Sequence, residues 1–305
     1  MLSSARAARL KPLLDDFTET RPWAERVRFD PVEFPHRYSD PRDIEVVALL
    51  SASLAYGRAD LFKPKIAAIL EGLGPGPAKA LRAMDVPALG PLLEGFVYRF
   101  NLPADVGVLL LGMGRSLEQH GTLEDVFLSS LASAGTFRGA VSHFAQSIRD
   151  AAPTKEIVRA LGRTRGLDHL LPTGSGAAKR LSLYLRWMVR GPDAIDFGVW
   201  TRVRKSQLVI PLDTHLARLG AWLGLTTRRT PGWAMAEEIT GSLRKLDPDD
   251  PVRYDFALCH FGMSGACPAR PVRSNCLKCP LRAECRVGRR LSGERLEGRR
   301  AAAMR

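Results

Sequence analysis

Four cysteines near the carboxyl end are the residues whose type and spacing point most directly to a chemistry. They lie within nineteen residues, and the chain has one further cysteine, Cys259. The four are Cys267, Cys276, Cys279 and Cys285. A Cys-x2-Cys pair places two thiolates on one tight turn, and two more thiolates nearby complete four ligands for a zinc ion or an iron–sulfur cluster. The sequence therefore predicts a metal centre.

The spacing of the four cysteines also bears on the identity of the metal. Zinc ribbons usually use two Cys-x2-Cys knuckles with a long loop between them, whereas three unequal gaps in one short stretch suit a cubane. We therefore expect a [4Fe-4S] cluster, with zinc as the alternative. Disulfides are the weaker interpretation, because no amino-terminal signal peptide would direct the chain to an oxidising compartment.

Composition limits the class of protein. With 305 residues, 45% hydrophobic and 25% charged, the chain can bury one large core or two medium ones. No apolar run approaches the ~20 residues needed to cross a bilayer, so we expect a soluble cytoplasmic protein that does not enter membranes. The formal net charge of +13 favours nucleic acid as a partner, although part of this charge is ordinary solvated surface.

Apolar residues follow helical spacing along most of the chain, which predicts an all-α fold. The expected helices cover about 41–73 in two parts separated at Gly57, then 104–119, 122–132, 137–151, 155–161, 175–189, 213–223, 231–246 and 251–261. Strand signals are confined to 199–210, which predicts at most a short extended connection.

A glycine-rich stretch, Leu171-Pro172-Thr173-Gly174-Ser175-Gly176-Ala177-Ala178-Lys179-Arg180, precedes one of these helices. Backbone N–H groups exposed by glycines at a helix start can hold a phosphate, and Lys179 and Arg180 add positive charge. The alternative is a turn capped by Ser175, with no ligand.

Asp213 stands in Leu212-Asp213-Thr214-His215, directly before an apolar helix. Its carboxylate is well placed to cap that helix, and a cap needs no active site. A carboxylate fixed beside a pocket can also orient or deprotonate a water molecule, or stabilise positive charge on a sugar while a glycosidic bond breaks. Both interpretations follow from the sequence.

Taken together and in chain order, these stretches resemble the helix-hairpin-helix DNA glycosylase superfamily, within its endonuclease III-like iron–sulfur branch. Over about residues 40 to 285, the matching motifs are Leu49-Leu50-Ser51-Ala52, Leu171-Pro172 with Gly174-Ser175-Gly176, Leu212-Asp213-Thr214-His215 with Arg218, and Gly262 followed by Cys267-Pro268-Ala269-Arg270. The runs 179–190 and 251–258 look like those of an uncharacterised bacterial subfamily.

The resemblance implies a two-lobed helical bundle with a DNA cleft. Residues 46–210 would form the central lobe, 1–45 with 211–290 the lobe that carries the cluster loop, and 291–305 a flexible basic tail. It implies a base-excision repair glycosylase that acts on double-stranded DNA, flips out a damaged or mismatched base and hydrolyses its N-glycosidic bond with Asp213. The residues expected to contact the DNA backbone are Gly174, Ser175, Gly176, Lys179, Arg180, Arg270, Arg273 and Lys278.

This sequence also departs from the family pattern. Bifunctional members carry a Schiff-base lysine two residues after the second hairpin glycine, where this chain has Ala178, with Lys179 one place later. Neighbouring helical residues are rotated by about 100°, so a catalytic role for Lys179 requires a shifted hairpin, and a glycosylase without lyase activity is expected. Ser53 stands where endonuclease III has a glutamine that helps fill the gap left by the flipped base, so the excised base is not readable. The alternative function is a catalytically inactive iron–sulfur protein that binds nucleic acid.

Overall fold

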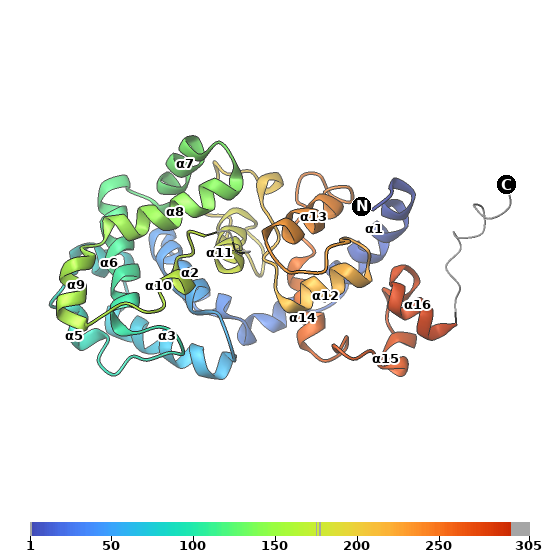
Figure 1. Ribbon diagram of the computed structural model, residues 1–305, viewed down its shortest axis with the longest axis horizontal. Coiled ribbons are helices and arrows are strands. Elements are labelled where there is room, and N and C mark those ends of the chain that lie inside the picture. The colour runs from blue at the N-terminus through green and yellow to red at the C-terminus, as the bar shows by residue number, and fades with distance from the viewer. Residues whose placement is uncertain (1, 175, 177, 294–305) are drawn as a thin grey trace. The chain divides into compact units, whose positions relative to one another are not determined.

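The structure is a computed structural model that describes residues 2–174, 176 and 178–293 (Figure 1). Ser175 and the tail beyond 293 lie outside these described residues. Within them the regular elements are helices, and the only β-type pairing is an isolated bridge between Tyr98 and Asn101. The predicted all-α fold is confirmed.

The chain divides into two compact units, residues 1–23 with 209–305 and residues 24–208. The first boundary differs from the expected one at 45, which falls inside helix α2 (Pro41–Leu54). The reason is packing: the short 3₁₀ turns after residue 30 bury Val32 and Phe34 within the second unit, so residues 24–45 belong with α2. The second boundary, at 208, lies close to the expected 210.

The unit formed by the two ends of the chain contains six α-helices in the described residues. They are α1 (Ser4–Glu19), α12 (Thr214–Trp222), α13 (Trp233–Leu243), α14 (Asp255–Met263), α15 (Arg273–Leu277) and α16 (Arg286–Ser292), with the 3₁₀ turn η5 (Arg282–Glu284). Helix α1 buries Leu10, Leu14 and Phe17, which recur at helical spacing. The ring of Phe17 meets that of Phe261 edge-on at 5.1 Å, which joins α1 to α14.

The middle unit contains ten α-helices in the described residues. They are α2 (Pro41–Leu54), α3 (Ala59–Leu73), α4 (Pro77–Ala83), α5 (Leu89–Leu92), α6 (Pro103–His120), α7 (Leu123–Ala134), α8 (Phe137–Ala151), α9 (Thr154–Leu161), α10 (Leu167–Leu170) and α11 (Lys179–Val189). Four 3₁₀ turns, η1 (Trp23–Phe29), η2 (Pro31–Glu33), η3 (Pro35–Arg37) and η4 (Lys205–Gln207), complete it, η1 beginning at the unit boundary. Every residue of α2 from Ile44 to Leu54 is buried, so α2 is the central helix of this unit.

The segment 199–210 forms no strand. It has the turn η4 and otherwise irregular backbone, because its side chains pack into a helical core rather than pairing with another strand. Trp200 is 2% exposed and lies among the rings of Phe127, Phe144 and Tyr184. Its indole N–H donates to Glu45 Oε1 at 2.6 Å, which ties this segment to α2.

One predicted helix starts later than expected. Helix α11 begins at Lys179, whereas the apolar pattern suggested Ser175. Ala178 adopts left-handed backbone (φ +45°), a conformation that interrupts a right-handed helix, so Gly174 and Gly176 stay outside α11 while Lys179 and Arg180 lie within it. No helix in the described part of the chain is long and apolar enough to cross a bilayer.

Candidate functional site

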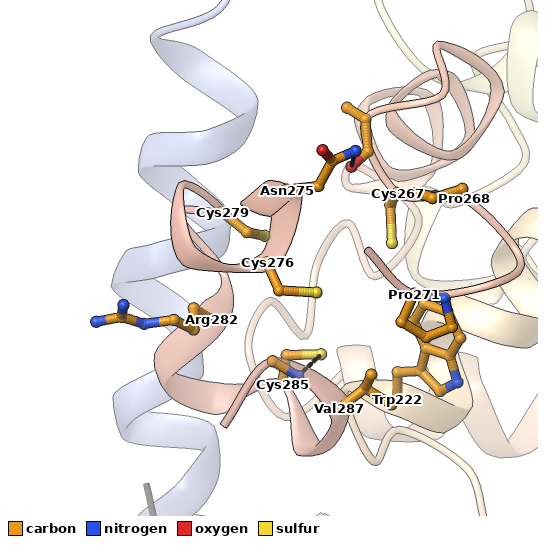
Figure 2. A pocket seen from close by; sticks show the side chains of 12 residues that line it. Trp222, Cys267, Pro268, Pro271, Asn275, Cys276, Cys279, Arg282, Cys285 and Val287 are labelled. Carbon is orange, nitrogen blue, oxygen red and sulfur yellow. Dashed lines mark hydrogen bonds between the residues drawn. The ribbon is translucent and has the colours of Figure 1, made fainter. Parts of the chain in front are cut away.

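The four predicted cysteine ligands line one pocket in the unit formed by the chain ends (Figure 2). Cys267 follows α14, Cys276 lies in α15, Cys279 follows it, and Cys285 caps the start of α16. All four are free and half-buried, and their sulfur atoms point into the same pocket. Helix geometry over a short stretch thus brings these thiols together.

Ionising three of these thiols, those of Cys267, Cys276 and Cys279, is unfavourable in the protein alone. Burial raises the pKa of Cys267 to about 11, and it also raises the pKa values of Cys276 and Cys279. Neighbouring cysteines of the set raise all three pKa values further, because clustered thiolates repel one another. A bound cation removes this repulsion and makes the thiolate form favourable.

The donor set fits a thiolate-bound metal, since four sulfurs face a pocket otherwise lined mainly by apolar atoms. Within residues 2–174, 176 and 178–293, no three His, Cys, Asp or Glu side chains have the spacing of a single metal ion. The preference for [4Fe-4S] over zinc therefore continues to depend on the sequence spacing.

Three basic residues of the cysteine segment lie on its outer surface. Arg270, Arg273 and Lys278 are exposed, as a contact with phosphate requires. Arg218 behaves differently: its Nη2 donates to the carbonyl oxygen of Cys267 at 2.7 Å, and its guanidinium lies over the ring of Trp222, which lines the pocket. Arg218 therefore joins α12 to the first cysteine.

Asp213 is half-buried and caps α12, as one of its two interpretations predicted. Its Oδ1 accepts from the Leu216 N–H at 2.7 Å, and its Oδ2 accepts from the Cys259 thiol at 3.2 Å. The carboxylate is thus fixed by one donor from α12 and another from α14.

Gly262 explains how α14 comes so close to α12. A Cβ built on this glycine would lie 2.7 Å from the Cβ of His215, closer than real Cβ contacts. The absence of a side chain at position 262 therefore sets the approach that lets Cys259 reach Asp213.

In the middle unit, the glycine-rich stretch joins α10 to α11. Gly174 and Gly176 are exposed and Lys179 is half-buried, while Ser175, expected to contact DNA, lies outside the described residues. Arg180 is also half-buried, with its guanidinium 4.9 Å from the ring centroid of Tyr56, and burial lowers the pKa of Arg180 to about 10. Arg180 thus packs on an aromatic ring, and phosphate binding by this stretch stays a prediction.

Tyr56 belongs to a cluster that the sequence did not reveal. We call it the arginine–aromatic surface, and its members are Tyr56, Tyr98, Arg99, Phe100, His169 and Arg180. Phe100 is 46% exposed, and its ring stacks on that of His169 at 4.6 Å with an interplanar angle of 23°. The Arg99 guanidinium lies 5.7 Å from the centroid of Phe100. An exposed, supported ring with cations beside it is the arrangement on which nucleic-acid bases stack.

The turn that presents Arg99 and Phe100 is held firmly. Arg99 has left-handed backbone (φ +51°), which is strained for a residue with a side chain. Asn101, which follows Phe100, is fully buried, and its backbone N–H and C=O both form hydrogen bonds with the backbone of Tyr98. Its Nδ2 also donates to the Gly166 carbonyl oxygen at 2.7 Å. Burial raises the pKa of Tyr56 to about 12, so its hydroxyl stays protonated and donates to the Tyr98 carbonyl oxygen at 3.0 Å.

No local pattern marks this surface, because its members come from segments separated by tens of residues. The one signal in the sequence is the short aromatic and basic run Tyr98-Arg99-Phe100.

Comparison with known proteins places the chain in a family. Residues 30–264 match the family described as Protein of unknown function (DUF2400), and the chain belongs to it. A search of curated proteins found no match. The matched residues include the arginine–aromatic surface, the glycine-rich stretch and Asp213, and they end three residues before Cys267.

Proposed function

We propose that this protein is a DNA glycosylase of base-excision repair that hydrolyses the N-glycosidic bond of a damaged or mismatched base. The observation that carries the proposal is the state of Asp213, a half-buried carboxylate fixed by Leu216 and Cys259. Such a group can stabilise positive charge on the sugar as the bond to the base breaks, and accept a proton from the attacking water.

Binding of DNA is supported by charge and by the arginine–aromatic surface. The net charge of +13 favours the phosphate backbone. Phe100, with its ring exposed and supported by His169, offers a face on which an unstacked base can lie. Glycosylases act on a base that has left the stack, so a platform for unstacked bases suits the proposed substrate.

The proposed metal centre has a supporting role. Cys267, Cys276, Cys279 and Cys285 would hold a [4Fe-4S] cluster or, alternatively, zinc. When bound, the metal supplies binding free energy that holds the thiolates together and orders the short helices around them. These residues would then present Arg270, Arg273 and Lys278 to the DNA backbone.

Strand cleavage is not part of the proposal. A lyase needs a lysine amine free to attack the sugar. The position expected for it holds Ala178, and Lys179 begins the next helix one residue later. Hydrolysis without lyase activity is therefore the expected chemistry.

A second candidate is a nucleic-acid-binding protein without catalysis. It is favoured by the same two contacts of Asp213, because a carboxylate that accepts from Leu216 and Cys259 is fully accounted for as a helix cap.

The two candidates are separated by incubating the protein with duplexes that carry oxidised, alkylated, deaminated or mismatched bases, followed by hot alkali. We expect excision by the wild type, and Asp213→Asn to lower its rate by about 10²-fold or more while DNA affinity stays within about twofold. Asp40→Asn is the matched control, since Asp40 also caps a helix, α2, and should keep full activity. Absence of excision by the wild type on every duplex would support the binding protein.

A further inference from the structure

One acidic residue stands apart within the cysteine segment. Residues 265–293 contain seven basic residues and a single acidic one, Glu284, directly before the last cysteine. In so basic a segment, an exposed glutamate would be expected to pair with its neighbours. Glu284 is instead only 5% exposed, so its carboxylate serves a contact inside the protein.

That contact is with the first helix of the chain. Glu284 Oε2 accepts from Arg6 Nε at 3.2 Å and Oε1 accepts from Arg9 Nε at 2.7 Å. Arg6 Nη2 also donates to the backbone carbonyl oxygen of Glu284 at 2.7 Å. The two arginines therefore hold both the side chain and the backbone of the residue that precedes Cys285. Figure 2 shows α1, in blue, beside this part of the cysteine segment.

The guanidinium of Arg6 lies against Gly224, and a larger residue at that position would leave no room for it. A Cβ built on Gly224, just beyond α12, would lie 2.1 Å from a guanidinium nitrogen of Arg6. Helix α1 is itself anchored elsewhere: Lys245 donates to the carbonyl oxygen of Leu2, and Tyr254 donates to Asp15, both at 2.7 Å. The arginines thus extend from a fixed helix.

We propose that Arg6, Arg9 and Glu284 form a clamp by which α1 fixes Cys285 in the metal pocket, so that retention of the metal depends on the amino-terminal helix. This inference rests on the proposed metal centre. Glu284, Arg6 and Arg9 are positioning residues: they touch no metal, and they act through the cysteine next to Glu284.

The clamp joins two segments that both lie outside the family match. Helix α1 precedes residues 30–264, over which the chain matches its family, and the cysteine segment follows them. The two segments also contact the matched residues, through Phe261 on α14, through Tyr254 and through Arg218, but the clamp links them directly to each other.

The test uses the full-length protein, purified without oxygen. It measures the rate at which a chelator removes the metal, by metal analysis and, if iron is present, by absorbance at roughly 400 nm. We expect Arg6→Met with Arg9→Met to release metal at least tenfold faster than the wild type, because the buried carboxylate then lacks its partners. Adding Glu284→Gln to that pair should restore part of the retention, since it removes the unpaired charge. Arg9→Met alone, at an exposed position, gives a mild variant that keeps the fold.

Arg253→Met is the matched control. Arg253 also pairs with α1, through Glu19, but does not contact the cysteine segment, so its loss should leave metal release unchanged. The clamp would be overturned if the double arginine variant released metal as slowly as the wild type. It would also be overturned if Arg253→Met released metal as fast as the double arginine variant.

The clamp and the metal centre can fail separately. If the wild type binds neither iron nor zinc, the metal proposal fails, and alkylation of Cys285 followed by mass spectrometry then tests the clamp directly. Faster alkylation in the double arginine variant than in Arg253→Met would support the clamp, and equal rates would reject it.

Discussion

The cysteine pocket and the arginine–aromatic surface are assembled in opposite ways. The four thiols come from nineteen consecutive residues, and their geometry follows from two short helices and the turns beside them. The arginine–aromatic surface gathers residues from four separate segments between position 56 and position 180: Tyr56, the run Tyr98-Arg99-Phe100, His169 and Arg180. The first site can be predicted from the spacing of its four cysteines in the sequence, whereas the second forms only once α2, α10 and α11 have packed together.

This difference decides what each site tolerates. A site built from one stretch loses its function when a single ligand is lost, because each of the other ligands depends on the same metal. A surface built from separate elements should lose affinity in steps, one contact at a time. Variants of each site should show this contrast directly.

Loss of one pocket cysteine should remove the metal altogether. We expect Cys279→Ser to contain little or no iron or zinc and to unfold at a lower temperature, because a structural metal adds its binding free energy to folding. Elemental analysis and thermal unfolding measure both effects. Cys259→Ser is the control, since Cys259 lies outside the pocket, and a similar metal loss there would contradict the pocket as described.

Truncation of the exposed ring should weaken nucleic-acid binding without abolishing it. Stacking of a base on an aromatic side chain contributes about 1–3 kcal/mol, so Phe100→Ala should lower affinity by roughly 5- to 150-fold. Fluorescence anisotropy with single-stranded and mismatched DNA measures the affinity of each variant. Phe29→Ala is matched in the same unit, because Phe29 is 47% exposed and also lies beside two arginines. Equal losses in both variants would remove the special role of Phe100.

A methyl group at Gly262 should disturb the contact between α12 and α14. The added Cβ would press on His215, and overpacking of this kind costs about 1–3 kcal/mol of the free energy of unfolding. Gly241→Ala, in α13 with open space around it, should stabilise by about 0.5–1 kcal/mol instead. Chemical denaturation measures the free energy of unfolding of both variants. If Gly262→Ala left that free energy unchanged, α14 would have to move away from α12 at no cost.

The smallest effect concerns pH and the middle unit. Burial raises the pKa of Glu45, so its folded form favours the proton, and the free energy of unfolding should fall as pH rises from about the unfolded value of 4.5 through the folded pKa. Glu45→Gln keeps an acceptor for Trp200 and should remove the dependence of the free energy of unfolding on pH. Each tenfold difference in proton affinity between the folded and unfolded states changes that free energy by about 1.4 kcal/mol. Urea unfolding at pH 4 and pH 7 measures it. Glu118→Gln, at an exposed position, should follow the wild type.

Much of the fold was predictable from the sequence, because helices depend on local periodicity. The apolar spacing located the helices around 104–119 and 137–151 nearly to the residue. It misplaced the start of α11, where the left-handed backbone of Ala178 depends on the loop rather than on apolar pattern. The first unit boundary was also missed, since nothing local shows that Val32 and Phe34 pack with α2.

The candidate sites divide in the same way. The cysteines and the capping role of Asp213 follow from residue type and spacing, whereas its hydrogen bond from Cys259 joins residues 46 positions apart. The packing of Arg180 on Tyr56 is of the same kind, because it depends on α11 meeting the connection that follows α2. Contacts between distant segments require the fold, and the sequence alone indicated only one member of each of these two pairs, Asp213 and Arg180.

The unit formed by both ends of the chain has a consequence for biosynthesis. Arg6 and Glu284 are 278 residues apart, and the partners of α1 described above, among them Lys245, Tyr254 and Phe261, lie beyond position 208. At ~5–20 residues per second, a ribosome needs on the order of 10–40 s to make the residues between α1 and position 208. During that time Leu10, Leu14 and Phe17 have no core to enter, while residues 24–208 can already fold. The nascent chain therefore completes its middle first, and its earliest helix is the last to find its place.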